Sequence, residues 1–239
     1  MKIISTADYA EMSRIAADIL SEQLKTKPDS VLGLATGSTP VGMYRELVSR
    51  CKKGEISFRK VTSVNLDEYV GLSPQHDQSY RYFMQKNLFE HIDIAPSHTH
   101  VPNGTTDFEE ECKRYNALIN ELGVDLQVLG LGHNGHIGFN EPGEEFVPDV
   151  HAVDLTESTI LANARFFASI EEVPRRAITM GIGNIMNAKK IILLVSGAEK
   201  AEIVKTAFTG TVTPRVPASI LQTHPDFTII GDAAALSKL

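Results

Sequence analysis

The sequence predicts an α/β fold in which a largely parallel, Rossmann-like sheet carries helices on both faces. Short apolar runs bounded by turn residues alternate with segments of helical periodicity from one end of the chain to the other. The 239 residues are 42% hydrophobic and 22% charged, as in ordinary globular proteins. Because no repeat, low-complexity tract or shift in composition divides the chain, we expect one domain over residues 1–239.

The N-terminal segment predicts a helix, followed by the first strand–turn–helix unit. Ser5 and Asp8 have the spacing of a capping box, with Asp in place of the usual Glu, and apolar residues then recur on one face over 12–20. An apolar strand over 30–35 leads through a polar turn to Pro40, which opens the next helix.

The rest of the chain continues this alternation. Strands are predicted over 61–66, 125–129, 177–181, 190–195 and 227–230, and helices over 79–92, 107–122, 156–167 and 198–208. Residues 143–150 form an irregular excursion with room to move. In open α/β sheets ligands bind beyond the carboxyl ends of the strands, so the active site is expected where the polar turns converge there.

Composition and charge exclude several classes of protein. No apolar stretch approaches the ~20 residues needed to cross a bilayer, and residues 1–5 do not begin a signal peptide, which predicts a cytoplasmic protein without a membrane partner. Cys51 and Cys112 stand in unrelated segments and are expected to be reduced structural thiols. The net charge of −7 argues against a nucleic-acid partner, but not against a small anion held by local donors.

The strongest functional signal is the stretch 130–142, Gly-Leu-Gly-His-Asn-Gly-His-Ile-Gly-Phe-Asn-Glu-Pro, which directly follows an apolar run. Glycines gathered with titratable side chains predict a backbone bent closely around a ligand. His136 and Glu141 lie five residues apart across a bend, so the carboxylate can orient the imidazole and support its charged form.

Two other interpretations of this stretch are weaker. A zinc site would have to start from His133 and His136 on non-helical backbone, with no third ligand nearby. The glycines at 130, 132 and 135 also meet the dinucleotide fingerprint, but that pattern must open a helix. Pro142 and Gly143 interrupt any helix there.

A polar turn over 36–39, Thr-Gly-Ser-Thr, places hydroxyls and backbone N–H groups at the start of a helix, where a phosphate binds well. Capping of that helix by Ser38 or Thr39 is the alternative explanation. The turn is not a Walker loop, because no Gly-Lys-Ser/Thr follows. Arg165 and Lys200 are ordinary surface charges when taken singly, but with this turn they favour a phosphorylated substrate.

The second predicted strand ends in two adjacent carboxylates, Asp67 and Glu68. At a strand end one carboxylate can face a pocket while its neighbour faces away, so either residue is a candidate proton-abstracting base. A solvated pair in a loop is the commoner explanation of such a sequence. A catalytic carboxylate would have to be partly desolvated, because desolvation raises its pKa toward the working pH.

Three segments together resemble the glucosamine-6-phosphate deaminase family: Leu-Ala-Thr-Gly-Ser-Thr-Pro at 34–40, Asn-Leu-Asp-Glu-Tyr-Val-Gly-Leu at 65–72 and Asn-Gly-His-Ile-Gly-Phe-Asn-Glu-Pro at 134–142. The likeness spans nearly the whole chain, and 164–167 and 196–201 resemble that family's phosphate-contacting segments. The resemblance implies conversion of glucosamine 6-phosphate and water to fructose 6-phosphate and ammonia in amino-sugar catabolism, without metal or organic cofactor.

The resemblance also implies a role for each candidate residue. His136, supported by Glu141 and Asn134, would move the proton that opens the pyranose ring. Asp67 would take the C2 proton and return it at C1 through an enediol-type intermediate. The phosphate would be held by Thr36, Gly37, Ser38, Thr39, Arg165 and Lys200. A lid around 146–170 is expected as well.

The chain departs from the family in two places. Many members carry Asp where this chain has Asn134, and because an amide orients an imidazole without supplying charge, Glu141 should give more of the electrostatic support. Hexameric members activated by N-acetylglucosamine 6-phosphate carry basic residues and serines after the Asn-Glu-Pro. Here the corresponding positions hold Glu144, Glu145, His151 and Val153. We therefore expect an unregulated monomer, and the lack of a C-terminal extension after Asp232 favours the same conclusion.

Two alternatives to the deaminase remain open. A 6-phosphogluconolactonase-like hydrolase shares the phosphate turn and a Gly-His motif, although the Phe-Asn-Glu-Pro sequence over 139–142 favours the deaminase. A sugar-phosphate-binding regulatory domain has a similar fold and no turnover. The complete acid–base set and the lack of a helix-turn-helix module before the first strand argue against it.

Overall fold

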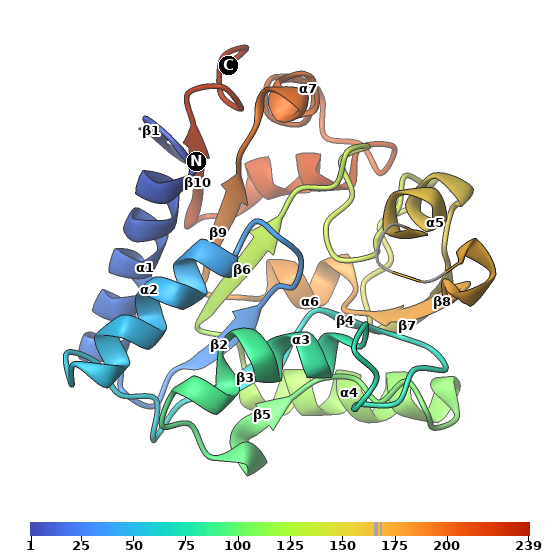
Figure 1. The fold of residues 1–239 in the computed structure, drawn as a ribbon. Coiled ribbons are helices and arrows are strands. Elements are labelled where there is room, and N and C mark those ends of the chain that lie inside the picture. Colours follow the sequence, from blue (N-terminus) through green and yellow to red (C-terminus); the bar gives the residue numbers. More distant parts are fainter. Residues whose placement is uncertain (165–166, 168) are drawn as a thin grey trace.

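The computed structural model describes residues 1–164, 167 and 169–239 and has the α/β architecture that the sequence predicts (Figure 1). Seven parallel strands form a large sheet in the spatial order β1 (Lys2–Thr6), β10 (Phe227–Asp232), β9 (Lys190–Val195), β6 (Leu126–Gly130), β2 (Val31–Leu34), β3 (Thr62–Asn65) and β5 (Thr99–His100). The central strands are almost entirely buried, as in parallel sheets that are covered on both faces.

Helices cover both faces of this sheet (Figure 1). Helices α1 (Tyr9–Thr26) and α2 (Val41–Lys52) pack side by side on one face, while α4 (Phe108–Leu122) and α6 (Ile182–Met186) lie toward the other. The remaining helical elements are α3 (Tyr80–Asn87), α5 (Glu157–Ala164) and α7 (Ala201–Thr209), with 3₁₀ turns η1 (Phe89–His91), η2 (Pro96–His98), η3 (Ile170–Glu172), η4 (Ala198–Lys200) and η5 (Pro217–Thr223). Every helix within the described residues is too short or too polar to span a bilayer.

A second, three-stranded antiparallel sheet stands beside the large one, in the order β4 (Asp67–Tyr69), β8 (Arg176–Thr179) and β7 (His151–Asp154). The chain passes from the large sheet to the small one at Leu66. The N–H of Leu66 donates to the Leu34 carbonyl at 3.3 Å, and its own carbonyl accepts the N–H of Met180 at 2.7 Å. Asp67 therefore begins the small sheet at the carboxyl edge of the large one.

The N-terminus differs from the sequence-based expectation in two ways. Residues 2–6 form an edge strand, β1, whose mostly exposed side chains carry little of the apolar signal that marks a buried strand. The helix that follows is capped by Asp8 and not by Ser5. The carboxylate of Asp8 accepts the N–H of Glu11 at 2.8 Å, and the Glu11 carboxylate accepts the N–H of Ala7 at 2.7 Å, so the capping residues lie three positions later than predicted.

Other differences concern short or exposed elements. The strand predicted over 177–181 is β8, which belongs to the antiparallel sheet, and the small strands β4, β5 and β7 were not predicted. The helix predicted over 79–92 ends at Asn87, because Leu88 leaves helical backbone geometry with φ −142°. The helix predicted over 156–167 is α5 as far as Ala164, and residues 165 and 166 lie outside the described part of the chain.

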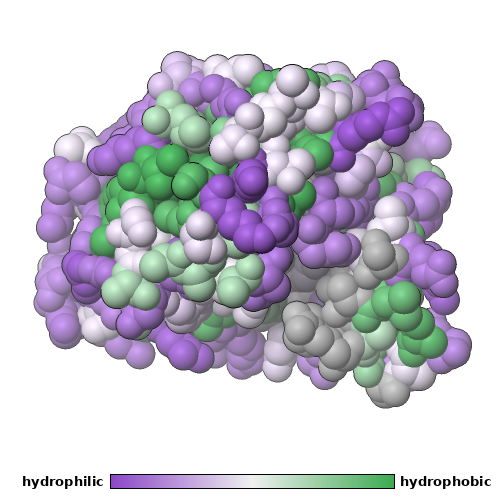
Figure 2. All heavy atoms as spheres, turned by 90° about the horizontal axis from the view of Figure 1, so that it is seen from above, coloured by the Kyte–Doolittle hydropathy of each residue, from purple (hydrophilic) through white to green (hydrophobic). Residues whose placement is uncertain are grey.

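Polar side chains cover most of the face that Figure 2 shows, and apolar ones gather there in small patches. The large apolar residues that stand exposed are scattered along the sequence: Met1, Ile3, Tyr9, Leu161, Ile170, Val212 and Leu239. Scattered residues of this kind are normal on a folded protein and need no partner to explain them.

Candidate active site

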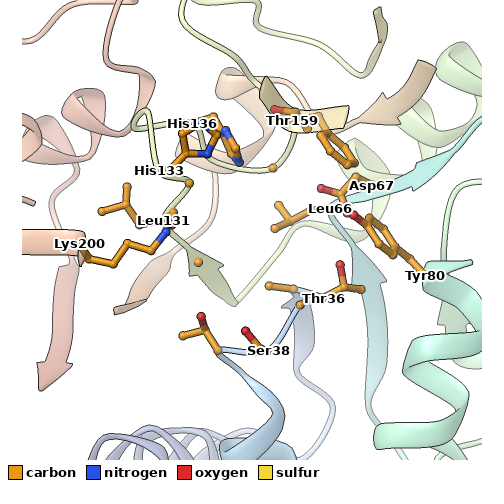
Figure 3. Close-up of a pocket in the computed structure, with 17 residues that line it drawn as sticks. Thr36, Ser38, Leu66, Asp67, Tyr80, Leu131, His133, His136, Thr159 and Lys200 are labelled. Carbon is orange, nitrogen blue, oxygen red and sulfur yellow. Dashed lines mark hydrogen bonds between the residues drawn. The ribbon is translucent and has the colours of Figure 1, made fainter. Parts of the chain in front are cut away.

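A cavity of about 450 Å³ opens at the carboxyl ends of β2, β3 and β6 (Figure 3). The predicted site residues that line it are Thr36, Gly37, Ser38, Thr39, Asp67, His136 and Lys200. Figure 3 shows Asp67 on one side of the cavity, His136 and Lys200 on the other, and Ser38 at a third edge. Asn134 and Glu141 contact His136 but are not among the cavity's lining residues, and Arg165 lies outside the described residues.

The turn between β2 and α2 presents its hydroxyls to the cavity. The Tyr9 hydroxyl donates to the Ser38 carbonyl at 3.0 Å and accepts the N–H of Gly42 at 2.8 Å, so α1 holds this turn in place. Helix α2 has Pro40 at its N-cap and no side-chain cap. The alternative that Ser38 or Thr39 serves as the cap is therefore wrong, and both side chains are left to contact a ligand.

Lys200 places a cation at the cavity edge opposite Asp67 (Figure 3). Its Nζ donates to the Leu131 carbonyl at 2.7 Å, which fixes the side chain beside the turn that follows β6. Burial lowers the pKa of Lys200, and the nearby Glu199 carboxylate opposes that shift. An anion bound in the cavity would favour the protonated form of Lys200 and so raise the pKa that burial lowers.

The two carboxylates of β4 take different roles, as the alternation of side chains along a strand allows. Asp67 lines the cavity and is only 6% exposed, and burial, with the charge of Glu68 as a smaller cause, raises the pKa of Asp67 to about 8. The carboxylate of Glu68 accepts the N–H groups of Tyr69, Tyr80 and Arg81, each at 2.9 Å, and so binds the first turn of α3. Of the two candidates, Asp67 is the one that can meet a substrate.

His136, Asn134 and Glu141 form one hydrogen-bonded set. Oδ1 of Asn134 accepts from Nδ1 of His136 at 2.7 Å, and Nδ2 of Asn134 donates to Oε2 of Glu141, also at 2.7 Å. The same Glu141 oxygen lies 3.4 Å from Nδ1 of His136. This network assigns the ring proton to Nδ1, so Nε2 of His136 is available to accept a proton.

The surroundings of Glu141 favour its ionised carboxylate. Burial alone would raise the pKa of Glu141, but hydrogen bonds and the charge of His136, with smaller contributions from Thr159 and Asn134, lower it to about 2. The carboxylate is therefore ionised across the physiological range and can stabilise an imidazolium at His136.

Glycine is required in this loop because the backbone passes directly under the imidazole. A Cβ at position 132 would lie 2.3 Å from the His136 ring, and Gly135 and Gly138 have positive φ values of 88° and 59°. No helix follows β6 before β7 begins at His151, which agrees with rejecting the dinucleotide fingerprint.

Among the cavity residues that are outside the predicted site set, three have side chains with polar atoms: Tyr80, His133, which the sequence offered only as a weak zinc ligand, and Thr159. The His133 ring lies edge-on to His136 with centroids 5.9 Å apart, and among the described residues no group of three potential metal ligands surrounds this pair. Tyr80 stacks on Phe139 at 6.0 Å, a contact between residues 59 positions apart that no local pattern reveals. The Thr159 hydroxyl donates to Oε1 of Glu141.

A second cavity, of about 290 Å³, shares Phe139 with the first. It is lined by the four positions at which regulated relatives were expected to differ, Glu144, Glu145, His151 and Val153. Arg215 binds both oxygens of Glu144, at 2.7 and 2.8 Å. The Glu145 carboxylate would repel an anionic effector at this place.

Comparisons with known proteins find relatives that match this chain over its whole length. A family model described as glucosamine-6-phosphate isomerases/6-phosphogluconolactonase matches residues 6–229. The chain is 57% identical to a glucosamine-6-phosphate deaminase of Thermoanaerobacter pseudethanolicus, with 100% of this chain and 95% of that protein covered. It is 59% identical to the enzyme of that name from Lachnoclostridium phytofermentans, with 96% and 98% covered.

Two solved structures share the fold. A monomeric glucosamine-6-phosphate deaminase matches all of both chains with a TM-score of 0.97 and 48% identity. A 6-phosphogluconolactonase from Trypanosoma brucei has a TM-score of 0.81 over 100% of this chain and 98% of its own, at 19% identity. At that identity the second likeness concerns the fold alone.

Proposed function

The chain belongs to the family of glucosamine-6-phosphate isomerases and 6-phosphogluconolactonases, and we propose that it converts glucosamine 6-phosphate and water to fructose 6-phosphate and ammonia. One observation carries the deaminase assignment. Two independent proton-transfer groups, Asp67 and His136, line opposite sides of a single cavity. A cyclic aldose that becomes a ketose needs one such group at the ring oxygen and another at the carbon chain, whereas hydrolysis of a lactone needs only an activated water.

The phosphate would bind where donors and a cation face the cavity. The turn 36–39 offers hydroxyls and backbone N–H groups at the start of α2, where the helix dipole favours an anion. Lys200 supplies a positive charge on the adjoining edge. The sugar would then extend from this end of the cavity toward Asp67 and His136.

Ring opening would be the work of His136. Nε2 accepts the proton of the C1 hydroxyl, the C1–O5 bond breaks as C1 becomes an aldehyde, and the imidazolium returns the proton to O5. The number of protons on the enzyme is unchanged at the end of this step. Glu141 stabilises the transient imidazolium, and Asn134 holds Nδ1 in position.

Isomerisation would be the work of Asp67. Its carboxylate removes the proton at C2, the electron pair forms the C1–C2 double bond, and the aldehyde oxygen gains the proton that the C2 ammonium gives up. The product is an enediol-type intermediate with an amine at C2. Asp67 then returns its proton to C1, which leaves a protonated imine at C2. Water adds there and ammonia departs, so the ketone of fructose 6-phosphate remains.

The raised pKa of Asp67 suits this scheme. A base works best when its pKa lies near the working pH, and burial raises the pKa of Asp67 to about 8. The substrate's ammonium group, bound next to the C2 proton, would favour the ionised carboxylate and so prepare the base only when substrate is present.

The decisive assay is the release of ammonia from glucosamine 6-phosphate by the purified chain, with fructose 6-phosphate formed in equal amount. Hydrolysis of 6-phosphogluconolactone without any ammonia would support the lactonase instead. Binding of sugar phosphate without turnover of either compound would support a regulatory domain. Asp67→Asn should bind glucosamine 6-phosphate and release no ammonia, and full turnover by this variant would remove Asp67 from the scheme.

We further propose that the enzyme is an unregulated monomer that acts in the cytoplasm, where sugar phosphates are formed and retained. The monomeric state described for the 48% identical structure supports this, as do the carboxylates around the second cavity. We propose also that the segment around 146–170, of which residues 165, 166 and 168 lie outside the described part of the chain, closes over the bound sugar. A hexamer in light scattering, or several-fold activation by N-acetylglucosamine 6-phosphate, would contradict the first proposal, and identical proteolysis of this segment with and without substrate would contradict the second.

A further inference from the structure

Glu141 divides its two carboxylate oxygens between two parts of the protein. Oε2 faces the ring-opening residues, because it accepts from Asn134 and lies 3.4 Å from Nδ1 of His136. Oε1 faces the other way and accepts the hydroxyl of Thr159, on the first turn of α5. The hydroxyl of Thr156 lies 3.4 Å from the same oxygen.

Thr159 is placed unusually for a helix threonine. It is only 3% exposed, and it lines the 450 Å³ cavity together with His136 and Asp67 (Figure 3). A hydroxyl in the first turn of a helix commonly serves the helix itself. That task falls to Thr156, whose hydroxyl accepts the N–H of Thr159 at 3.3 Å. The Thr159 hydroxyl is therefore not needed to start α5.

The bond from Thr159 bears on the direction in which Glu141 points. A carboxylate anchored through one oxygen only can rotate about its last side-chain bond, and rotation would withdraw Oε2 from His136. A hydroxyl on Oε1 opposes that rotation. It also helps to keep the carboxylate ionised, because Thr159 is among the groups that lower the pKa of Glu141.

We propose that Thr159 is a positioning residue for ring opening, which holds Glu141 against His136 from the side of α5. This inference rests on the proposed deaminase function. It adds that the imidazole is fully supported only while α5 lies against the loop that carries Glu141. Thr159 itself transfers no proton, because its hydroxyl hydrogen stays on the bond to Glu141.

The test compares Thr159→Val, which keeps the shape and removes the hydroxyl, with Thr159→Ser, which keeps the hydroxyl. Both kcat and KM for ammonia release from glucosamine 6-phosphate are measured at the pH of greatest activity. Thr159→Val should lower kcat by roughly 10- to 100-fold with little change in KM, as expected for the loss of a hydrogen bond to a charged group. Thr159→Ser should restore most of the activity.

Two further variants separate positioning from a loss of structure. Thr206→Val removes a helix threonine hydroxyl that donates to the Glu202 carbonyl and does not line the cavity, and it should leave kcat unchanged. In a Glu141→Gln background, Thr159→Val should cost little more, because the carboxylate that it positions is already gone. This comparison remains informative even if Thr159→Val shifts the urea midpoint.

The outcomes are distinct. If the wild-type chain releases no ammonia, the proposed function fails. If the wild type is active and Thr159→Val keeps kcat within twofold, only the role of Thr159 fails. A loss of kcat that is equally large in the Glu141→Gln background would also overturn it, since Thr159 would then act through the fold.

Discussion

Replacing Asp67 with Asn should stabilise the folded protein by a margin that grows with pH. Burial raises the pKa of Asp67 from 3.8 to about 8, so between these values the folded chain holds a proton that the unfolded chain has released. The contribution to stability is complete below pH 4, falls as the pH rises, and is lost by pH 8. At about 1.4 kcal/mol per pH unit, the upper bound for the loss at pH 7 is roughly 4 kcal/mol. An amide has no such proton to lose.

The measurement is urea unfolding of the wild type and Asp67→Asn at pH 5, 6, 7 and 8. The difference in free energy of unfolding should widen at each step by up to about 1.4 kcal/mol, whatever constant offset the amide itself introduces. Asp29→Asn serves as the control for loss of one negative charge, because the Asp29 side chain is 71% exposed. Parallel stability profiles for wild type and Asp67→Asn would refute the argument, since they would show that the carboxylate is as well solvated in the cavity as in the unfolded chain.

Three other variants test neighbouring parts of the site. Gly132→Ala should lower kcat by about 10²-fold with an unchanged circular dichroism spectrum, because its Cβ would lie 2.3 Å from the His136 ring. Glu68→Ala should cost about 2 kcal/mol or more in urea unfolding, because it leaves the N–H groups of α3 that the carboxylate accepts without a partner. Lys200→Met should raise KM for glucosamine 6-phosphate by roughly tenfold or more and leave kcat nearly intact, as steady-state kinetics would show.

The buried strands of the large sheet were predictable because they are continuous apolar runs. Strands β2, β6 and β9 lie within one or two residues of their predicted limits. The edge strand β1 and the strand β7 were not, because they are short and partly exposed, and β4 is buried but only three residues long. The pairing within the small sheet also joins distant segments such as Tyr69 and Ala177. The sequence therefore predicts the large sheet, whose central strands are buried and apolar. It does not reveal that a second sheet exists.

The candidate site was predictable to the extent that its residues share a local motif. His136, Asn134 and Glu141 lie within eight positions, and their hydrogen bonds follow from that spacing. The choice of Asp67 over Glu68 depends on which side of β4 meets α3, which no local pattern specifies. The contact of Thr159 with Glu141 depends in the same way on where α5 docks.

Because the chain passes from one sheet to the other at Leu66, the residues of the candidate site are divided between the large sheet and the small sheet. The large sheet carries the phosphate turn and the imidazole loop, while the small sheet carries Asp67 and leads through β7 to α5. In the proposed mechanism, the residues that bind the phosphate therefore belong to a different structural unit from the group that acts on the carbon chain. If so, the small sheet and its connections could change to serve another reaction, while the turn on the large sheet continued to bind the phosphate of the substrate.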